Sequence, residues 1–199
     1  MASEMVANER KRPWYLVLSL LAALAFGANA ARRGWLVMLA YHVPIESSLM
    51  GKDIADEGDR AALVARVDAY VRVLDEAKPR AWPVGVASLL LGGATLFFAM
   101  RAMSGSRSAR TALLQLVIAQ AALSATSHWL LRDVDEAEVR LIEAQAAAKH
   151  ENVPIEMLRG AYSVVLASQL LGSALIVVAL TRRRSRDFFD ASASAVRER

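Results

Sequence analysis

The sequence contains no cysteine among its 199 residues. No disulfide bond can therefore hold its hydrophilic segments together. These segments are stable only where they pack as helices.

Ionisable side chains are missing from the central parts of four apolar stretches, at residues 14–31, 82–100, 111–131 and 161–180. A bilayer core about 30 Å thick needs roughly 20 apolar residues for each helical span. Hydrophobic residues make up 55% of the chain, above the usual share in soluble domains. Because lipid offers no hydrogen-bond partner to an open backbone, the spans must be helical. The sequence predicts an all-α protein, a bundle of four transmembrane helices.

Recognisable catalytic groups are missing as well. The chain has no nucleophile constellation, no phosphate-binding loop, no zinc motif and no pair of buried carboxylates. We therefore predict that the protein is not an enzyme and has no catalytic residue, metal ion or cofactor.

Histidine is scarce, with three residues. His42 and His128 both fall near the outer membrane boundary, and a haem or a metal ion bound between them is one alternative. Ligating pairs usually have carboxylate support or an i, i+4 spacing on one helix, which these two lack. The competing interpretation is that both are interfacial residues, beside Tyr41 and Trp129 respectively.

The charge distribution predicts the orientation. Segments 1–13, 101–110 and 182–199 hold 12 Lys or Arg and 5 Asp or Glu, whereas segments 32–81 and 132–160 hold 12 and 15. Basic flanks stay in the cytoplasm, so we expect both termini there and both long loops outside. Arg32 and Arg33 are exceptions to this rule. With 24 basic residues of which four are lysine, the composition is typical of a bacterial inner-membrane protein, and no nucleic acid is expected as a partner.

The first span also resembles a signal peptide, since a basic segment and an apolar run precede Ala28-Asn29-Ala30. The apolar run is long, and removing it would leave a repeat without its first helix. We expect the span to be retained as an anchor.

An internal repeat relates the two halves of the chain. Residues 81–101 and 161–181 share nine identities in 21 ungapped positions, and the register extends to 13 identities between 52–101 and 132–181. The sequence predicts two parallel helical hairpins, 1–101 and 102–181, followed by a cytoplasmic tail at 182–199, in which residues 187–199 carry no periodic pattern. The first hairpin carries an insertion near 34–50, interpreted as an outward continuation of the first helix, ended by Pro44, or as an interfacial segment.

The extracytoplasmic segments are amphipathic. Apolar residues recur at three- and four-residue spacing within 63–74 and 139–146, which indicates helices. These helices either pack on each other or leave an apolar face for a partner. Acidic clusters at 53–57 and 133–136 are interpreted as helix starts, with a divalent cation site as the alternative. Pro79 and Pro154 are expected to break the chain before the following spans.

Two groups of residues inside the spans are candidate sites. Gln115, Gln120 and Ser124 form a predicted polar seam, whose residues either hydrogen-bond between helices or line a path. Two small-xxx-small motifs, at Ser88 and Gly92 and at Ser168 and Gly172, predict close helix packing. Their equivalent positions indicate that the second and fourth spans meet, or that two chains dimerise there.

The predicted function is that of an accessory, scaffold or sensor-like subunit in the lipid bilayer. It would bind another membrane or periplasmic protein, or a second copy of itself, through its outer helices or span surface. Two alternatives remain open: a small channel or transporter along the polar seam, and a haem-binding redox subunit.

Overall fold

The computed structural model describes residues 12–40, 54 and 56–197, and these residues form six α-helices and no strand. The helices are α2 (Trp14–Ala40), α3 (Glu57–Met103), α4 (Arg107–Leu130), α5 (Arg132–Ala148), α6 (Ile155–Thr181) and α7 (Arg183–Arg197). Three of them, α2, α3 and α6, are long and apolar enough to cross a membrane. The fourth predicted span lies mostly in α4, where Gln115, Gln120 and His128 lower the mean hydropathy, so its insertion stays a prediction.

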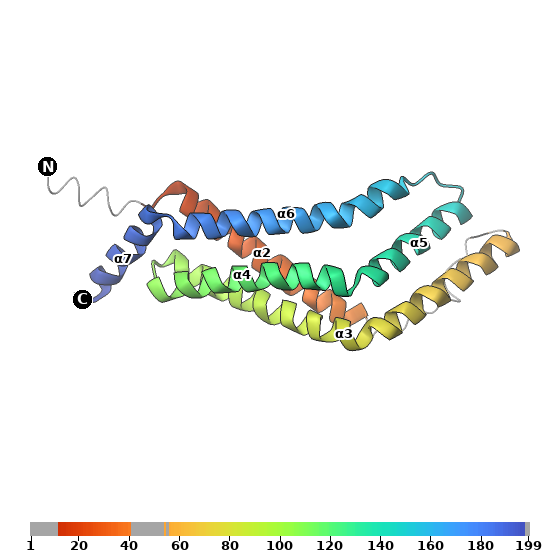
Figure 1. Cartoon of the computed structure of the whole chain (residues 1–199), viewed down its shortest axis with the longest axis horizontal. Coiled ribbons are helices and arrows are strands. Elements are labelled where there is room, and N and C mark those ends of the chain that lie inside the picture. Colours follow the sequence, from red (N-terminus) through yellow and green to blue (C-terminus); the bar gives the residue numbers. More distant parts are fainter. Residues whose placement is uncertain (1–11, 41–53, 55, 198–199) are drawn as a thin grey trace.

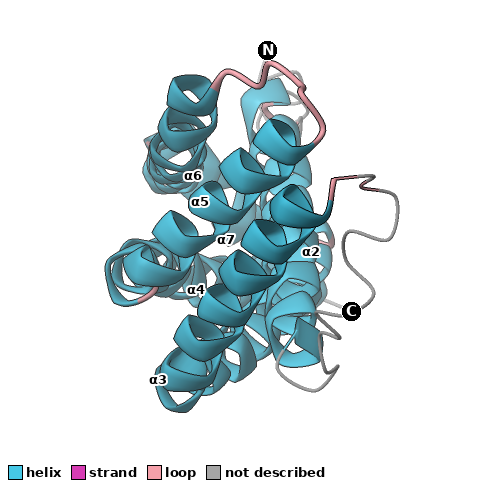
Figure 2. Cartoon of the chain, turned by 90° about the vertical axis from the view of Figure 1, so that its right-hand side faces the viewer, coloured by secondary structure: helices cyan, strands magenta, loops and turns pink. Residues whose placement is uncertain are grey.

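The long helices lie side by side along the molecule (Figure 1). α2 contacts α3 and α6, and α4 contacts the same two helices. The end-on view in Figure 2 shows α6, α4, α3 and α2 in this order around the long axis. α5 and the first half of α3 extend to one end, and α7 covers the other; we call these the α5 end and the α7 end.

The interface between α2 and α3 depends on four buried glycines. Gly27 and Gly34 of α2 face Gly92 and Gly85 of α3, and a Cβ atom added at Gly34 would lie 2.5 Å from the Gly85 carbonyl oxygen. A Cβ atom at Gly27 would lie 2.9 Å from the Gly92 carbonyl oxygen. Only glycine permits backbones this close, and in lipid such close contact drives helix association. The two helices therefore pack along most of α2.

Two apolar clusters fill the two ends. The α7-end cluster joins α2, α3, α4, α6 and α7, and its largest completely buried side chains are Leu16, Leu20, Leu113, Leu180 and Phe189. The α5-end cluster, Ile54, Leu63, Val67 and Leu141, joins α3 to α5. The prediction that the outer helices pack on each other is thus confirmed.

The described residues of both acidic clusters lie at helix starts, as predicted. Asp56 caps α3, because its side chain accepts a hydrogen bond from the Asp59 amide at 3.0 Å. Asp133 and Asp135 occupy the first turn of α5, where carboxylates complement the positive end of the helix. Pro154 precedes α6 as its N-cap, also as predicted.

The predicted break at Pro79 is wrong, because Pro79 and Pro83 both lie inside α3, which is 47 residues long. A proline removes one hydrogen bond and bends a helix; the neighbouring turns of α3 remain bonded. Figure 1 shows α3 changing direction in its yellow segment, near these residues. In the second half of the chain the equivalent region is divided into α5 and α6, so the repeat remains a prediction. The predicted helix end at Pro44 lies outside the described residues.

The prediction that residues 187–199 have no regular pattern is wrong for 187–197, which belong to α7. Phe188 and Phe189 are buried in the α7-end cluster. The Ser185 hydroxyl is also buried and donates a hydrogen bond to the Ala179 carbonyl at 2.7 Å. Arg107 and Asp190 form an ion pair of 3.2 Å that holds α7 against α4.

We predict that Gly92→Ala destabilises the protein and that Gly93→Ala does not. The added methyl group at Gly92 would collide with the backbone of Gly27 and Ala31, whereas a Cβ atom at Gly93 meets nothing within 4 Å. Overpacking of this kind costs about 1–3 kcal/mol, and alanine at the open site gains helix propensity of about 0.5–1 kcal/mol. Thermal unfolding in detergent, followed by circular dichroism, measures both changes. Equal melting temperatures for the two variants would contradict the glycine interface.

Candidate ligand-binding cavity

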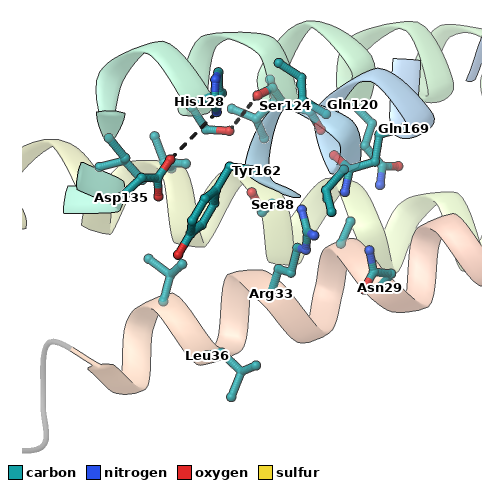
Figure 3. Close-up of a pocket in the computed structure, with 18 of the residues that line it drawn as sticks. Asn29, Arg33, Leu36, Ser88, Gln120, Ser124, His128, Asp135, Tyr162 and Gln169 are labelled. Atoms are coloured by element: carbon teal, nitrogen blue, oxygen red, sulfur yellow. Dashed lines mark hydrogen bonds and ion pairs between the residues drawn. The ribbon is translucent and has the colours of Figure 1, made fainter. Parts of the chain in front are cut away.

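A cavity of about 470 Å³, open on one side, lies between the two apolar clusters and is lined by α2, α3, α4 and α6, with Asp135 of α5 at one side. Its polar lining residues are Asn29, Arg33, Ser88, Gln120, Ser124, Ser127, His128, Asp135, Tyr162, Gln169 and Ser173. Apolar side chains, among them Phe26, Leu36, Val165 and Leu166, make up the rest of the wall. Figure 3 shows side chains from the different helices around this space.

Gln120 joins three helices at the cavity floor. Its side-chain nitrogen donates a hydrogen bond to the Phe26 carbonyl of α2 at 3.2 Å. Its side-chain oxygen accepts one from the Thr95 hydroxyl of α3, also at 3.2 Å. The Phe26 ring fills the space beside Gly172 of α6, where a Cβ atom would lie 2.5 Å from the ring. The floor is therefore a fixed part of the structure, with both polar ends of the buried Gln120 amide satisfied.

Polar contacts at the α5 end of the cavity connect α4, α5 and α6. His128 Nδ1 lies 3.7 Å from a carboxylate oxygen of Asp135, as Figure 3 shows. The Tyr162 hydroxyl donates a hydrogen bond to the Glu138 carboxylate at 2.9 Å. Burial raises the pKa of Asp135 to about 6, with His128 opposing this shift and Glu138 and Asp133 adding to it.

Arg33 lines the same cavity from α2. Figure 3 shows its side chain rising from the α2 ribbon toward the space between Tyr162 and Gln169. Arg33 is exposed and forms no hydrogen bond or ion pair with any residue that the structure describes, whereas two other lining residues, His128 and Asp135, contact each other.

The three residues of the predicted polar seam do not lie together in the structure. Gln120 and Ser124 both line the cavity, but Gln115 is exposed and lies outside it. The candidate haem ligand His128 contacts Asp135, and the other candidate, His42, lies outside the described residues. Within the described ranges, no three His, Asp or Glu side chains are grouped so that they could hold a metal ion.

The two small-residue motifs occupy different environments. Gly92 packs against Gly27 and Ala31 of α2, and Gly172 faces the Phe26 ring, also on α2. Ser88 lines the cavity, and Ser168 is exposed, donating a hydrogen bond to the Val165 carbonyl at 2.8 Å. The expectation that the glycines of the second and fourth spans meet each other is therefore wrong: α2 lies against both.

Sequence reasoning missed Arg33, Asp135 and Tyr162 as lining residues. Arg33 did carry a signal, because it was an exception to the charge rule that fixed the orientation. An ionisable residue within an apolar helix of a membrane protein commonly faces the helix bundle or a water-filled cavity. Asp135 and Tyr162 carried no comparable signal, since their placement depends on the packing of α5 against α6.

Comparison with known proteins gives no relative: no family model matches the chain, and neither a curated protein nor a solved structure matches it. The cavity and its chemistry therefore provide the basis for a functional proposal.

We predict that Asp135→Asn stabilises the protein at pH 7.5 and has less effect at pH 4.5. The folded state raises the pKa of Asp135 to about 6 from 3.8, so it binds this proton more tightly than the unfolded chain. Stability contributed by the carboxyl group therefore falls as pH rises from about 4 to 6. After allowance for partial solvent exposure, we expect about 1 kcal/mol of gain at pH 7.5.

The measurement is thermal unfolding at the two pH values. Glu143→Gln is the matched control, because Glu143 is exposed on the same helix. A gain at pH 7.5 that persists unchanged at pH 4.5 would contradict the assignment to Asp135 ionisation.

Proposed function

We propose that the protein is a non-enzymatic, sensor-like integral membrane protein that binds a small amphipathic molecule in the cavity. The observation that carries this proposal is the cavity itself, about 470 Å³ in volume with mostly apolar walls and a few convergent polar groups. Ligand sites typically have volumes of about 300–1,000 Å³ and this mixture of side chains.

The packing of the α7 end favours binding over conduction. Leu16, Leu20, Leu113 and Leu180 are completely buried in the cluster below the cavity floor. Gln120, which would line a path, has its amide bonded to Phe26 and Thr95. A transporter remains the rival proposal, and solute flux in reconstituted vesicles that Gln120→Leu abolishes would favour it.

The proposal places α4 in the membrane beside the three apolar helices, as a four-helix bundle. Exposed apolar side chains on α6, such as Leu171 and Leu175, then face lipid, a partner membrane protein or a second copy of the chain. The basic α7 end lies in the cytoplasm and the α5 end outside, as arginine-rich flanks favour. This location corresponds to a bacterial inner membrane.

We predict that Ser124→Phe removes ligand binding and that Ala125→Phe retains it. A phenyl group at Ser124 would occupy the cavity, whereas Ala125 is exposed and does not line it. Native mass spectrometry of protein purified from membranes measures small molecules that stay bound after detergent is released. Equal retention by both variants, or none by the unaltered protein, would contradict a cavity ligand.

The orientation is tested with single cysteines, because the chain has none of its own. We expect a membrane-impermeant maleimide to label Ala61→Cys in intact spheroplasts and to label Ser108→Cys only after lysis. Both positions are exposed, at the α5 end and the α7 end respectively. The reverse pattern would invert the proposed topology.

A further inference from the structure

We propose that the ligand is a single-chain amphiphile with a carboxylate head, its head bound by Arg33 and its chain held against the apolar walls of α2 and α6. This inference rests on the proposed function and specifies the chemistry of the ligand.

Charge complementarity supports an anionic head. The charged or titratable groups that line the cavity, apart from the Tyr162 phenol, are Arg33, His128 and Asp135. His128 and Asp135 contact each other at 3.7 Å, and the Tyr162 hydroxyl is bonded to Glu138. The guanidinium of Arg33 has no partner among the described residues. The Arg33 side chain is exposed, so an anion from outside the protein can reach it.

The geometry of the arginine side chain favours a carboxylate as the head group of the ligand. A guanidinium donates two parallel hydrogen bonds to a carboxylate, and these charge-assisted bonds are about twice as strong as neutral ones. Asn29 lies one turn before Arg33 and lines the same wall, so its amide can donate a further bond. A doubly charged phosphate would place additional negative charge in a cavity that already contains the Asp135 carboxyl.

The apolar walls of the cavity favour a ligand whose remaining part is a hydrocarbon chain. Phe26 and Leu36 flank Arg33 on α2, and Val165 and Leu166 face them from α6. The cavity volume of about 470 Å³ lies in the range of about 300–1,000 Å³ that is typical of sites for one small molecule. This volume suits one acyl chain better than the two chains of a phospholipid.

The experiment uses two photoreactive probes of equal chain length, a diazirine-bearing dodecanoic acid and the corresponding dodecanol. Both are added at pH 7.5 to the full chain in phosphatidylcholine vesicles, and cross-linked peptides are quantified. We expect the acid to label peptides of α2 and α6 with at least about tenfold higher yield than the alcohol. Arg33→Gln should lower acid labelling by about tenfold, corresponding to the loss of one charge-assisted contact.

Arg32→Gln is the matched control, because it removes the same charge from the neighbouring position, which does not line the cavity. Arg33→Lys should restore part of the acid labelling, since it restores charge without the forked donor. Equal labelling by acid and alcohol, or equal losses in Arg32→Gln and Arg33→Gln, would overturn the carboxylate head and leave the cavity-binding function intact. Failure of both probes to label α2 or α6 would overturn the proposed function as well.

Discussion

The close contact between α2 and α3 determines the arrangement of the other helices. At Gly27, Gly34, Gly85 and Gly92 the two backbones meet without intervening side chains. Lipid supplies no hydrophobic force between helices, so van der Waals contact of this kind must supply the attraction. Since the contact follows α2 over two turns, it fixes both the separation and the direction of that helix.

The cavity is a consequence of this direction. α2 lies close to α6 where Phe26 meets Gly172, and it then continues along α3 through Gly34. Figure 1 shows α2 crossing from the neighbourhood of α6 at its start to that of α3 at its end. Beyond the crossing, Arg33 of α2 and Tyr162 and Gln169 of α6 line the cavity. The four glycines thus determine where the cavity forms, although none of them lines it.

Much of the helical pattern could be predicted from the sequence, because hydrophobic length and helix-start residues are local signals. The helix starts at Asp56 and in the first turn of α5 follow from carboxylates at positive helix ends. Pro79 was misleading, because a proline ends an isolated helix more readily than it ends one fixed by packing on both sides. α7 was missed although Ser185, Phe188, Phe189 and Ser192 recur at i, i+3, i+4 and i+7, which is the spacing of one helical face.

The cavity was harder to predict than the helices. Gln120 and Ser124 were identified from their polarity inside a span, but the partners of Gln120, which are Phe26 and Thr95, depend on how three helices cross. The sequence does contain a signal for the glycine interface, because Gly27 and Gly34 are seven residues apart, as are Gly85 and Gly92. The pairing of the α2 glycines with the α3 glycines depends on the antiparallel packing of the two helices. This packing cannot be predicted from a single sequence.

The helix α3 connects the two ends of the molecule without interruption. Its 47 residues extend for about 70 Å at 1.5 Å per residue, more than twice the thickness of a bilayer core. Pro79 and Pro83 lie near the middle of α3, beside the ion pair between Arg80 of α3 and Asp133 of α5. One half of α3 carries the α5-end cluster and the other half carries Ala99 and Ala102 of the α7-end cluster. Each end cluster therefore depends for its position on the same helix and on the bend of that helix near Pro79 and Pro83.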